Sequence, residues 1–554
     1  MKKKLLSVLA LSMCFCMGVS SFAGCNGGDE SSSAPNSEQQ NSEQQNSDSQ
    51  GGEQGGEQGG EQGGETQKPL TQDEILAKIL EASEATMAHN GAISFAVEGK
   101  EEDITTSSRG TEKETSEMLA TASVDSAAGK MFMKSVQKEA EGETSEMTMK
   151  YFKEGEKNYS FMQQKQSTGV EGEEPMVFDM YSEVSEIGLK SAMEELNVME
   201  SGYFDIGELG VNESVGIEAM NAAYAKVITE SKADIEAQAD DENSEWYQCN
   251  ADGSFLLSCA EVEGAYVLTM KMAMTIAYPE GERAALREAV LTAKDGKLVS
   301  IAITQAETEV YYVVYEDELD EYGEMVIKGT EGAVEVTEVY NYEMGIALAY
   351  EFAETDYNAI TTTLPTDPTQ IMPATDSYTK AVQVYINGMD EGREYCSGET
   401  IEEAMDSMYV PYGMEVVWYM DEACTQEFDV TMSAEEFFAM EALYGVATPM
   451  EGYVLYTEEY KDVFGADVTD EYKLAFADMI GNSKHFGAVD VNSGFSFYKH
   501  EGEVITVNGT EVTFEEEDYW TNYTIEEGQT YEVVYTTTYM KADLNFFSMF
   551  SSGK

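Results

Sequence analysis

The first apolar pattern in the chain has the spacing of a helix. Between residues 70 and 91, apolar side chains recur every three or four positions, which places them on one helical face. Thr71 with Glu74 three residues later forms a capping-box signature, and Gly91 is a candidate for the residue after the helix end. The apolar positions are Ile75, Leu76, Ile79, Leu80 and Met87. The pattern predicts one amphipathic helix over residues 70–91.

After Gly91 the apolar positions alternate with polar ones, which indicates strands with one buried face. Asp295-Gly296 lies between two such runs and predicts a two-residue hairpin turn. Two later stretches, at about residues 181–199 and 215–232, return to a helical period. The alternating positions are Ile93, Phe95, Val97, then Met147, Met149, Tyr151, Tyr159, Phe161, and then Tyr266, Leu268, Met270, Met272, Met274 and Ile276.

The order of elements over residues 70–365 is a helix, antiparallel strands, one or two helices and further strands. With the segments "LTQDEILAKILEASEAT", "YFKEGEKNYSFMQ" and "LTAKDGKLVSIAI", this order resembles the LolA-like and LppX/LprG-like bacterial lipoproteins. The resemblance implies an α+β fold, in which a curved antiparallel β-sheet (a half-barrel) is wrapped on helices. It also implies a concave apolar surface that can hold acyl chains.

The strand faces that such a surface would use are rich in methionine and tyrosine. Met is flexible and fills irregular apolar surfaces, which suits a cavity for variable apolar ligands. Ordinary packing of these side chains against the covering helices explains the same pattern. The candidate ligand residues are Met147, Met149, Tyr151, Tyr266, Leu268, Met270, Met272 and Met274.

Residues 376–554 are expected to form a smaller β-rich, β-grasp-like domain or two small modules. Residues 409–429, "YVPYGMEVVWYMDEACTQEFD", resemble the Listeria–Bacteroides repeat of internalin-type surface proteins, which implies a spacer or interaction module. Helical patterns are expected at 434–446 and 469–481, and Asn508-Gly509 predicts a hairpin. The residues that carry the resemblance are Gly413, Trp418, Tyr419, Asp421, Cys424 and Phe428.

The N-terminus has the pattern of an export signal. Lys2, Lys3 and Lys4 precede an apolar run over residues 5–19, which is too short to span a bilayer of roughly 30 Å. The following Phe22-Ala23-Gly24-Cys25 resembles the bacterial lipobox, which implies a signal peptide over residues 1–24 and a diacylglycerylated Cys25. A cleavage site without lipid is the alternative interpretation.

Residues 25–69 contain "NSEQQNSEQQNSDSQ" and "GGEQGGEQGGEQGGET", and offer no large apolar side chain before Leu70. Such a composition cannot offset the entropy of ordering, so we expect a disordered tether. Two acyl chains on Cys25 would anchor the chain stably. The tether would then hold the folded part near the outer face of the cytoplasmic membrane of a Gram-positive bacterium.

Composition limits the partners and the chemistry. The chain has 106 acidic and 32 basic residues and a formal charge of −74, which disfavours binding to nucleic acid. The three histidines are scattered, and no pattern predicts a catalytic site, a metal site or a cofactor. Cys249 and Cys259 could close a small disulfide loop or remain buried thiols.

The predicted function is therefore that of a membrane-anchored extracytoplasmic lipoprotein that binds or carries a lipid or lipopeptide. The alternative is a surface display or adhesion module that binds a glycan or a protein through the C-terminal region. An enzyme is the least favoured of the three classes, and the identity of any protein partner is not predicted.

Overall fold

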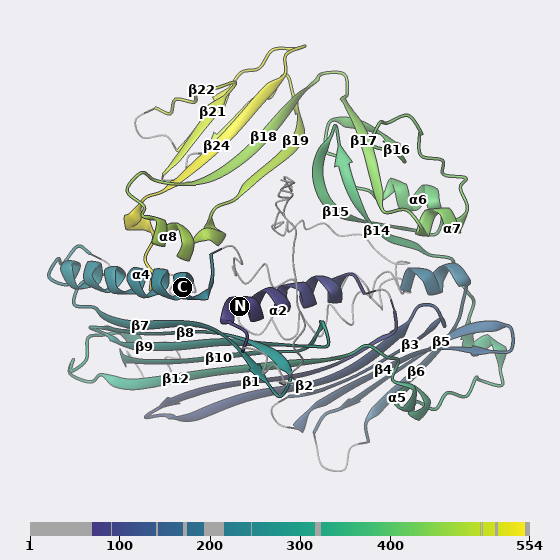
Figure 1. Ribbon diagram of the computed structural model, residues 1–554, viewed down its shortest axis with the longest axis horizontal. Helices are drawn as coiled ribbons and strands as arrows, with labels where there is room; N and C mark the ends of the chain where they lie inside the picture. The colour runs from purple at the N-terminus through teal and green to yellow at the C-terminus, as the bar shows by residue number, and fades with distance from the viewer. Residues whose placement is uncertain are drawn as a thin grey trace, which may run out of the picture.

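A computed structural model describes residues 69–89, 91–139, 142–169, 174–192, 215–244, 246–315, 323–498, 500, 502–515 and 519–548. A large sheet forms the base of the molecule, and two smaller sheets lie above it (Figure 1). Helices α2 (Gln72–Met87) and α4 (Ile217–Gln238) lie in one layer between the base and the smaller sheets.

The base is a 13-stranded sheet in the order β13-β6-β5-β4-β3-β2-β1-β12-β10-β9-β8-β7, with β11 paired to β10. Every pair is antiparallel except β13 with β6. Two meanders therefore meet at the β1–β12 pair. The strands are β1 (Ile93–Ser107), β2 (Gly110–Asp125), β3 (Lys130–Lys138), β4 (Thr144–Glu154), β5 (Lys157–Ser167), β6 (Met176–Val184), β7 (Asn250–Val262), β8 (Ala265–Tyr278), β9 (Gly281–Lys294), β10 (Lys297–Val314), β11 (Glu324–Met325), β12 (Val334–Ala349) and β13 (Ile371–Met372).

Local sequence signals explain several of these boundaries. Thr71 caps α2 and Glu74 returns the bond to the Thr71 backbone, so the predicted capping box is confirmed. Asp295 and Gly296 both have positive φ, at 52° and 76°, as a type I′ turn requires, which confirms the predicted hairpin between β9 and β10. The helix ends at Met87 with Ala88 as its cap residue, so the prediction that Gly91 follows its end is wrong.

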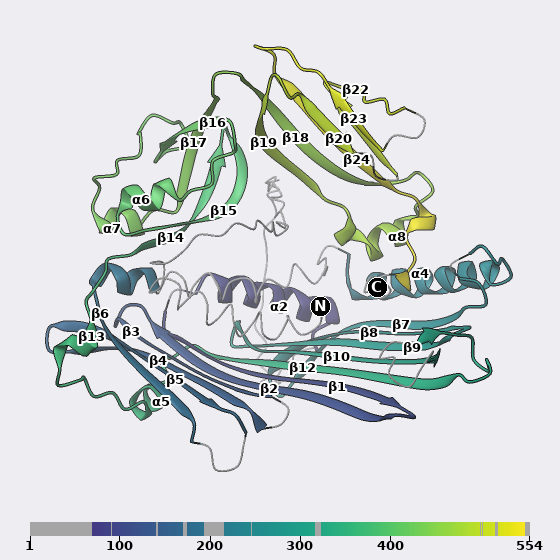
Figure 2. The ribbon, with the colours of Figure 1, turned by 180° about the vertical axis from the view of Figure 1, so that it is seen from behind.

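The smaller sheets are built alike. The four-stranded sheet has the order β15-β14-β17-β16, and the five-stranded sheet has the order β19-β18-β24-β21-β22. In each sheet the first and last strands in the sequence, β14 with β17 and β18 with β24, pair in parallel near the centre. Figure 2 shows both sheets from behind, with a further pair, β20–β23, beside the five-stranded sheet.

These strands are β14 (Tyr378–Ile386), β15 (Met389–Gly398), β16 (Met414–Tyr419), β17 (Ala442–Pro449), β18 (Tyr453–Phe464), β19 (Asn482–Asp490), β20 (Phe495–Tyr498), β21 (Glu503–Val507), β22 (Thr510–Glu511), β23 (Trp520–Tyr523) and β24 (Tyr531–Tyr539). The short helices are α5 (Glu354–Ala359), α6 (Ile401–Asp406), α7 (Ala434–Phe438) and α8 (Asp470–Ala475), and the 3-10 turns are Pro368–Gln370, Ala477–Met479 and Lys541–Asp543.

The last residues of the described chain return to the base. Phe546 and Phe547 are fully buried in a core with α4, α8 and the β7–β8 pair. The Phe546 amide donates to Ser231 Oγ at 3.1 Å, and Lys541 pairs with Glu230 at 2.6 Å. On the other side, the Thr379 amide of β14 donates to Ser191 Oγ at 3.0 Å. The four-stranded sheet is thus bonded to the helical segment that follows β6, and the residues after β24 are bonded to α4.

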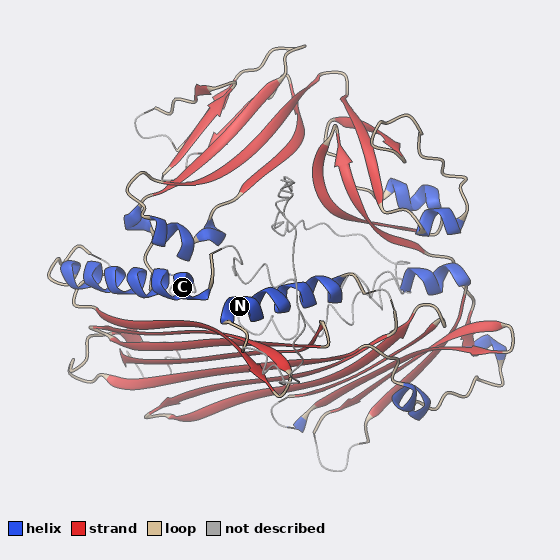
Figure 3. Ribbon diagram, viewed as in Figure 1, coloured by secondary structure: helices blue, strands red, loops and turns tan. Residues whose placement is uncertain are grey.

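The predicted α+β class is wrong, because strands dominate the described chain and helices are a minor component (Figure 3). The 13-stranded sheet is not wrapped on helices; α2 and α4 cover only part of one face. Two predicted helices are confirmed only in part, because strands take up the rest. Residues 181–184 belong to β6 while residues 186–192 are helical, and the helix expected at 434–446 ends at Phe438 and is followed by β17.

Candidate functional site

One face of the base sheet carries an apolar row across most of its width. Cross-strand partners point to the same side of a sheet, so the pairing register identifies the residues that share this face. The row begins at Met147 of β4 and ends at Cys259 of β7. It is apolar except for Ser135, and its members are Met147, Ser135, Ala120, Val97, Ile346, Ile301, Leu291, Leu268 and Cys259.

Helix α2 covers the centre of this face. Ile75, Leu76 and Ile79 of α2 are at most 4% exposed and form one core with the sheet residues Leu268, Leu291 and Ile346. Tyr266 and Met270 pack at the margin of this core. Met272 and Met274 belong to the neighbouring core beneath α4. All five predicted ligand residues of β8 therefore lie in packed cores with helical side chains.

The predicted residues of β4 lie elsewhere on the same face, seven strands from β8. Met149 is buried, whereas Met147 and Tyr151 are partly exposed. They form a methionine cluster with their neighbours on β3 and β5, and the one contributor outside the sheet among the described residues is Leu189. The methionine cluster comprises Met131, Met133, Met147, Met149 and Met162. The structure thus divides the predicted surface into two separate groups.

Toward the other end of the strands the same face becomes polar. Arg283 of β9 pairs with Glu307 of β10 at 3.1 Å, and both side chains are mostly buried. Tyr278 donates to Glu309 at 2.8 Å, and Tyr311 donates to Glu338 at 2.8 Å. Burial raises the pKa of each tyrosine, and the adjacent carboxylate raises it further. Both hydroxyls therefore remain protonated donors at neutral pH.

The sequence interpretation missed this polar network. Its signal is the alternation of Glu and Tyr in "TQAETEVYYVV" together with two arginines in "ERAALREAV". This alternation indicates strands, but the hydrogen-bonded residues are 27 and 31 positions apart in the sequence. No local pattern therefore shows which tyrosine bonds to which glutamate.

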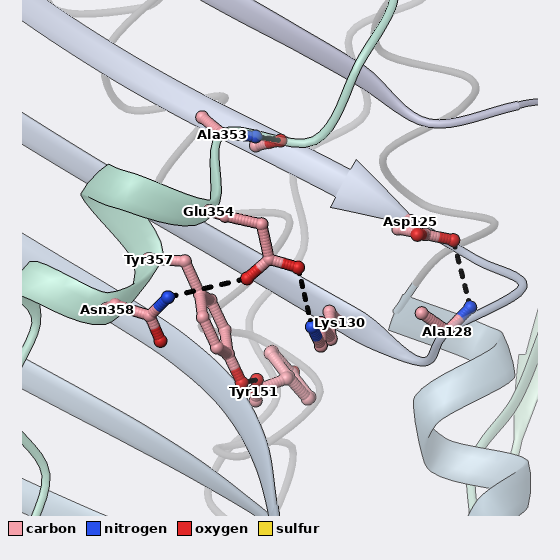
Figure 4. Close-up of polar contacts among 9 residues, drawn as sticks. Asp125, Ala128, Lys130, Tyr151, Ala353, Glu354, Tyr357 and Asn358 are labelled. Carbon is pink, nitrogen blue, oxygen red and sulfur yellow. Dashed lines mark hydrogen bonds and ion pairs between the residues drawn. The ribbon is translucent and has the colours of Figure 1, made fainter.

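A second cluster lies on the opposite face, beneath α5 (Figure 4). Lys130 Nζ pairs with Glu354 Oε1 at 2.7 Å, and the Tyr357 hydroxyl donates to the Tyr151 carbonyl at 2.9 Å. Lys150 is 7% exposed; its Nζ donates to the Ile360 carbonyl at 2.8 Å and lies 4.1 Å from the centre of the Tyr357 ring. Burial lowers the pKa of Lys150. These contacts fasten α5 to the sheet.

Other candidate chemistry is sparse in the described part of the chain. No group of His, Cys, Asp and Glu side chains there could hold a metal ion. None of the helices in the described ranges is long and apolar enough to cross a membrane. Cys259 is a free buried thiol, so it is not bonded to Cys249, and burial raises its pKa to about 12. Cys25, the predicted lipid-attachment residue, lies outside the described residues.

The repeat-like segment is folded as part of the four-stranded sheet. Trp418 of β16 packs against that sheet's core, and Phe428 donates its amide to the Trp418 carbonyl at 2.8 Å. Asp421 accepts bonds from the Thr425 and Gln426 amides, which lower its pKa. Tyr409 and Tyr412 of the same segment are 68% and 81% exposed.

Comparisons with known proteins add little. No family model matches the chain, and no curated protein matches it. Several solved structures show weak likeness, and three of them are given below. Neisserial surface protein A has 5% identity and a TM-score of 0.11, with 47% of this chain and 99% of that chain covered. A DUF1329 family protein from Desulfovibrio piger has 8% identity and a TM-score of 0.12, with 52% and 99% covered.

The third is a putative outer membrane lipoprotein-sorting protein domain from Vibrio parahaemolyticus. It has 9% identity and a TM-score of 0.09, with 52% of this chain and 96% of that chain covered. It belongs to the class of domain that residues 70–365 resemble by sequence pattern. At these scores the three likenesses carry no argument about fold or function.

Proposed function

We propose that this protein is an extracytoplasmic lipoprotein that binds an apolar ligand, a lipid or lipopeptide, on its base sheet. In this proposal Cys25 carries the lipid anchor and holds the protein at the outer face of the cytoplasmic membrane. The ligand contacts the methionine cluster of β3–β5. The role is one of binding and carriage.

The observation that carries the proposal is that, among the described residues, a single side chain from outside the sheet packs on the methionine cluster. Met147, Tyr151 and Met162 are partly exposed, and in the described part of the chain only Leu189 packs on their cluster from outside the sheet. The β8 residues, by contrast, pack against side chains of α2 and α4, although Tyr266, Met270 and Met272 are also partly exposed. Methionine side chains adapt to ligands of varied shape. The proposal therefore moves the ligand site from β8, where the sequence pattern also placed it, to β3–β5.

The test is lipid binding by the full chain purified in its native form. Organic extracts analysed by mass spectrometry are expected to contain a copurified lipid, and a fluorescent fatty acid is expected to bind and be displaced by it. Met147→Asp and Met162→Asp are expected to weaken binding by about tenfold or more, because each places a charge against the bound apolar surface.

The matched control is Leu119→Asp, since Leu119 is 46% exposed on the opposite face of β2. It adds the same charge to the same sheet and is expected to leave lipid binding unchanged. Absence of both copurified lipid and fatty-acid exchange in the wild-type protein contradicts the proposal. So does equal weakening by Leu119→Asp.

The anchor is tested separately from the ligand. Cells that express the wild-type chain are expected to incorporate radiolabelled palmitate into it and to retain it in the membrane fraction. Cys25→Ala is expected to abolish both labelling and retention. Retention of the unlabelled Cys25→Ala protein in the membrane contradicts lipid anchoring, whatever the outcome for ligand binding.

A further inference from the structure

The two-stranded sheet β20–β23 has two faces of different character. Strand alternation directs Phe495 and Phe497 into the core of the last module, which is the part of the chain that contains the five-stranded sheet. There they are 8% and 2% exposed. Their rings lie 5.5 Å apart, and the Phe495 ring lies 5.1 Å from that of Tyr456. The inward face therefore fixes this sheet firmly on the five-stranded sheet.

The outward face is formed by two cross-strand pairs. Tyr498 lies opposite Trp520, and Ser496 lies opposite Asn522. Tyr498 and Trp520 are 56% and 57% exposed, and the adjacent Tyr519 is 70% exposed. The Ser496 hydroxyl bonds to the Asn522 side-chain oxygen at 2.9 Å. The ring of His500 lies 5.2 Å from that of Tyr498. We call Tyr498, Trp520, Ser496 and Asn522 the aromatic platform.

The exposure of Trp520 is unusual within this chain. Of the other two tryptophans, Trp246 is 9% exposed in the core beneath α4, and Trp418 packs on the core of the four-stranded sheet. An exposed indole leaves apolar area in contact with water, which burial in a complex would remove. Tyr and Trp supply rigid contact area with little conformational entropy to lose on binding.

The chemistry of the aromatic platform identifies its ligand. Neither strand, "FSFY" or "WTNY", contains a charged residue, although 25% of the chain is charged. A pyranose ring has a face of C–H groups and a rim of hydroxyls. The C–H face matches the negative face of an aromatic ring, and the hydroxyls match the Asn522 amide and the Ser496 hydroxyl.

The size of the aromatic platform argues against a protein partner. Two paired strands of four residues span about 13 Å by 5 Å, which accommodates a few sugar units. A stable protein interface needs about 800 Å² on each partner, far more than such a surface offers. The formal charge of −74 also repels polyanions. We propose that the aromatic platform binds a neutral polysaccharide. This binding is independent of the proposed lipid binding.

Affinity gel electrophoresis of the full chain tests the proposal. The gels contain starch, xylan, mannan or laminarin as neutral probes and polygalacturonate as an anionic probe. At least one neutral probe is expected to retard the wild-type protein. Trp520→Ala and Tyr498→Ala are expected to weaken that retardation by about tenfold or more, whereas Trp520→Phe retains part of it.

Tyr412→Ala is the matched control, because Tyr412 is 81% exposed on the other small sheet's module. It is expected to bind like the wild type. Unchanged thermal unfolding of each variant shows that the fold is retained. The proposal is overturned if no neutral probe retards the wild type, if polygalacturonate alone does so, or if Trp520→Ala binds as the wild type does.

Aromatic side chains can also enter a lipid surface, so a second measurement separates the two ligands. Cosedimentation with phosphatidylcholine vesicles is expected to be equal for wild type and Trp520→Ala. A loss of vesicle binding in Trp520→Ala, without any retardation by a neutral probe, overturns the proposal in favour of a membrane contact.

Discussion

Glu391 of β15 lies at the junction of the two smaller sheets, close to β19. Its Oε1 atom is buried without a hydrogen-bond partner among the described residues, and its Oε2 atom lies 4.0 Å from His485 Nδ1. Burial, together with the neighbouring carboxylates of Glu394 and Asp390, raises the pKa of Glu391 to about 7. The ionised Glu391 carboxylate therefore destabilises the folded state as the pH rises through neutrality.

We expect Glu391→Gln to stabilise the protein above pH 7. The folded pKa lies above the unfolded value, so the stability that the wild-type carboxyl contributes is full below pH 4.5 and is lost as the pH rises through about 7. The amide does not titrate, and at pH 8 the variant should be more stable by about 1–2 kcal/mol, given partial solvent access. Thermal unfolding at pH 8 and pH 4.5 measures the difference.

His485→Gln is the control for that experiment, because it removes the imidazole that lies 4.0 Å from the Glu391 carboxylate. It should leave the pH dependence of the Glu391→Gln gain in place. A gain of the same size at both pH values would show that packing, and not ionisation, is responsible.

At the scale of elements, β7 is an edge strand of the base sheet, and side chains of α4 and α2 hydrogen-bond to its outer backbone groups. The Asn221 carboxamide of α4 donates to the Leu257 carbonyl at 2.7 Å and accepts from the Leu257 amide at 2.8 Å. The Gln72 side chain of α2 accepts from the Cys259 amide at 3.0 Å. These contacts take the place of a neighbouring strand, and an edge closed in this way is poorly suited to pair with another chain.

Asn221→Ala is expected to destabilise the protein by about 1–3 kcal/mol, because it leaves both backbone groups of Leu257 without their partner. It should also promote association through the opened edge. Thermal unfolding and sedimentation velocity measure the two effects. Asn243→Ala, at an exposed position with only local bonds to Asp241, is expected to change neither. A monomeric Asn221→Ala protein of unchanged stability would contradict this role.

Elements with a local cause were predictable from the sequence. The α2 capping box and the Asp295-Gly296 turn each depend on residues within a few positions of one another. Residues 181–184 and 442–446 were mistaken for helix because a short apolar run fits either period, and pairing with β5 and β16 decided the outcome. The predicted ligand residues fall into two groups because α2 and α4 pack on β8. The pattern of apolar positions in a strand does not show which helix will cover it.

At the scale of the whole molecule, the C-terminal residues hold the last module on the base. Phe546 and Ser231 are 315 residues apart in sequence, so this contact has no local signal. The docked surface also includes the Lys226–Glu471 pair at 2.7 Å and the bond from the Tyr224 hydroxyl to the Ala475 carbonyl at 2.9 Å. These contacts act against the mutual repulsion of parts of a chain with a formal charge of −74.

Phe546→Ala with Phe547→Ala is therefore expected to release the last module from α4. Each truncation removes a fully buried ring and costs about 3–5 kcal/mol. Gly253→Val should act from the other side, because a Cβ there meets the Phe546 and Phe547 rings at 3.0 and 3.1 Å.

Small-angle X-ray scattering should show a larger radius of gyration for both variants, most at low ionic strength, where repulsion is least screened. Hydrogen exchange should rise in α4 and α8, while Tyr498→Ala, which truncates an exposed ring, leaves scattering and exchange unchanged. Unchanged scattering in both variants at low ionic strength would mean that the remaining contacts suffice to hold the modules together.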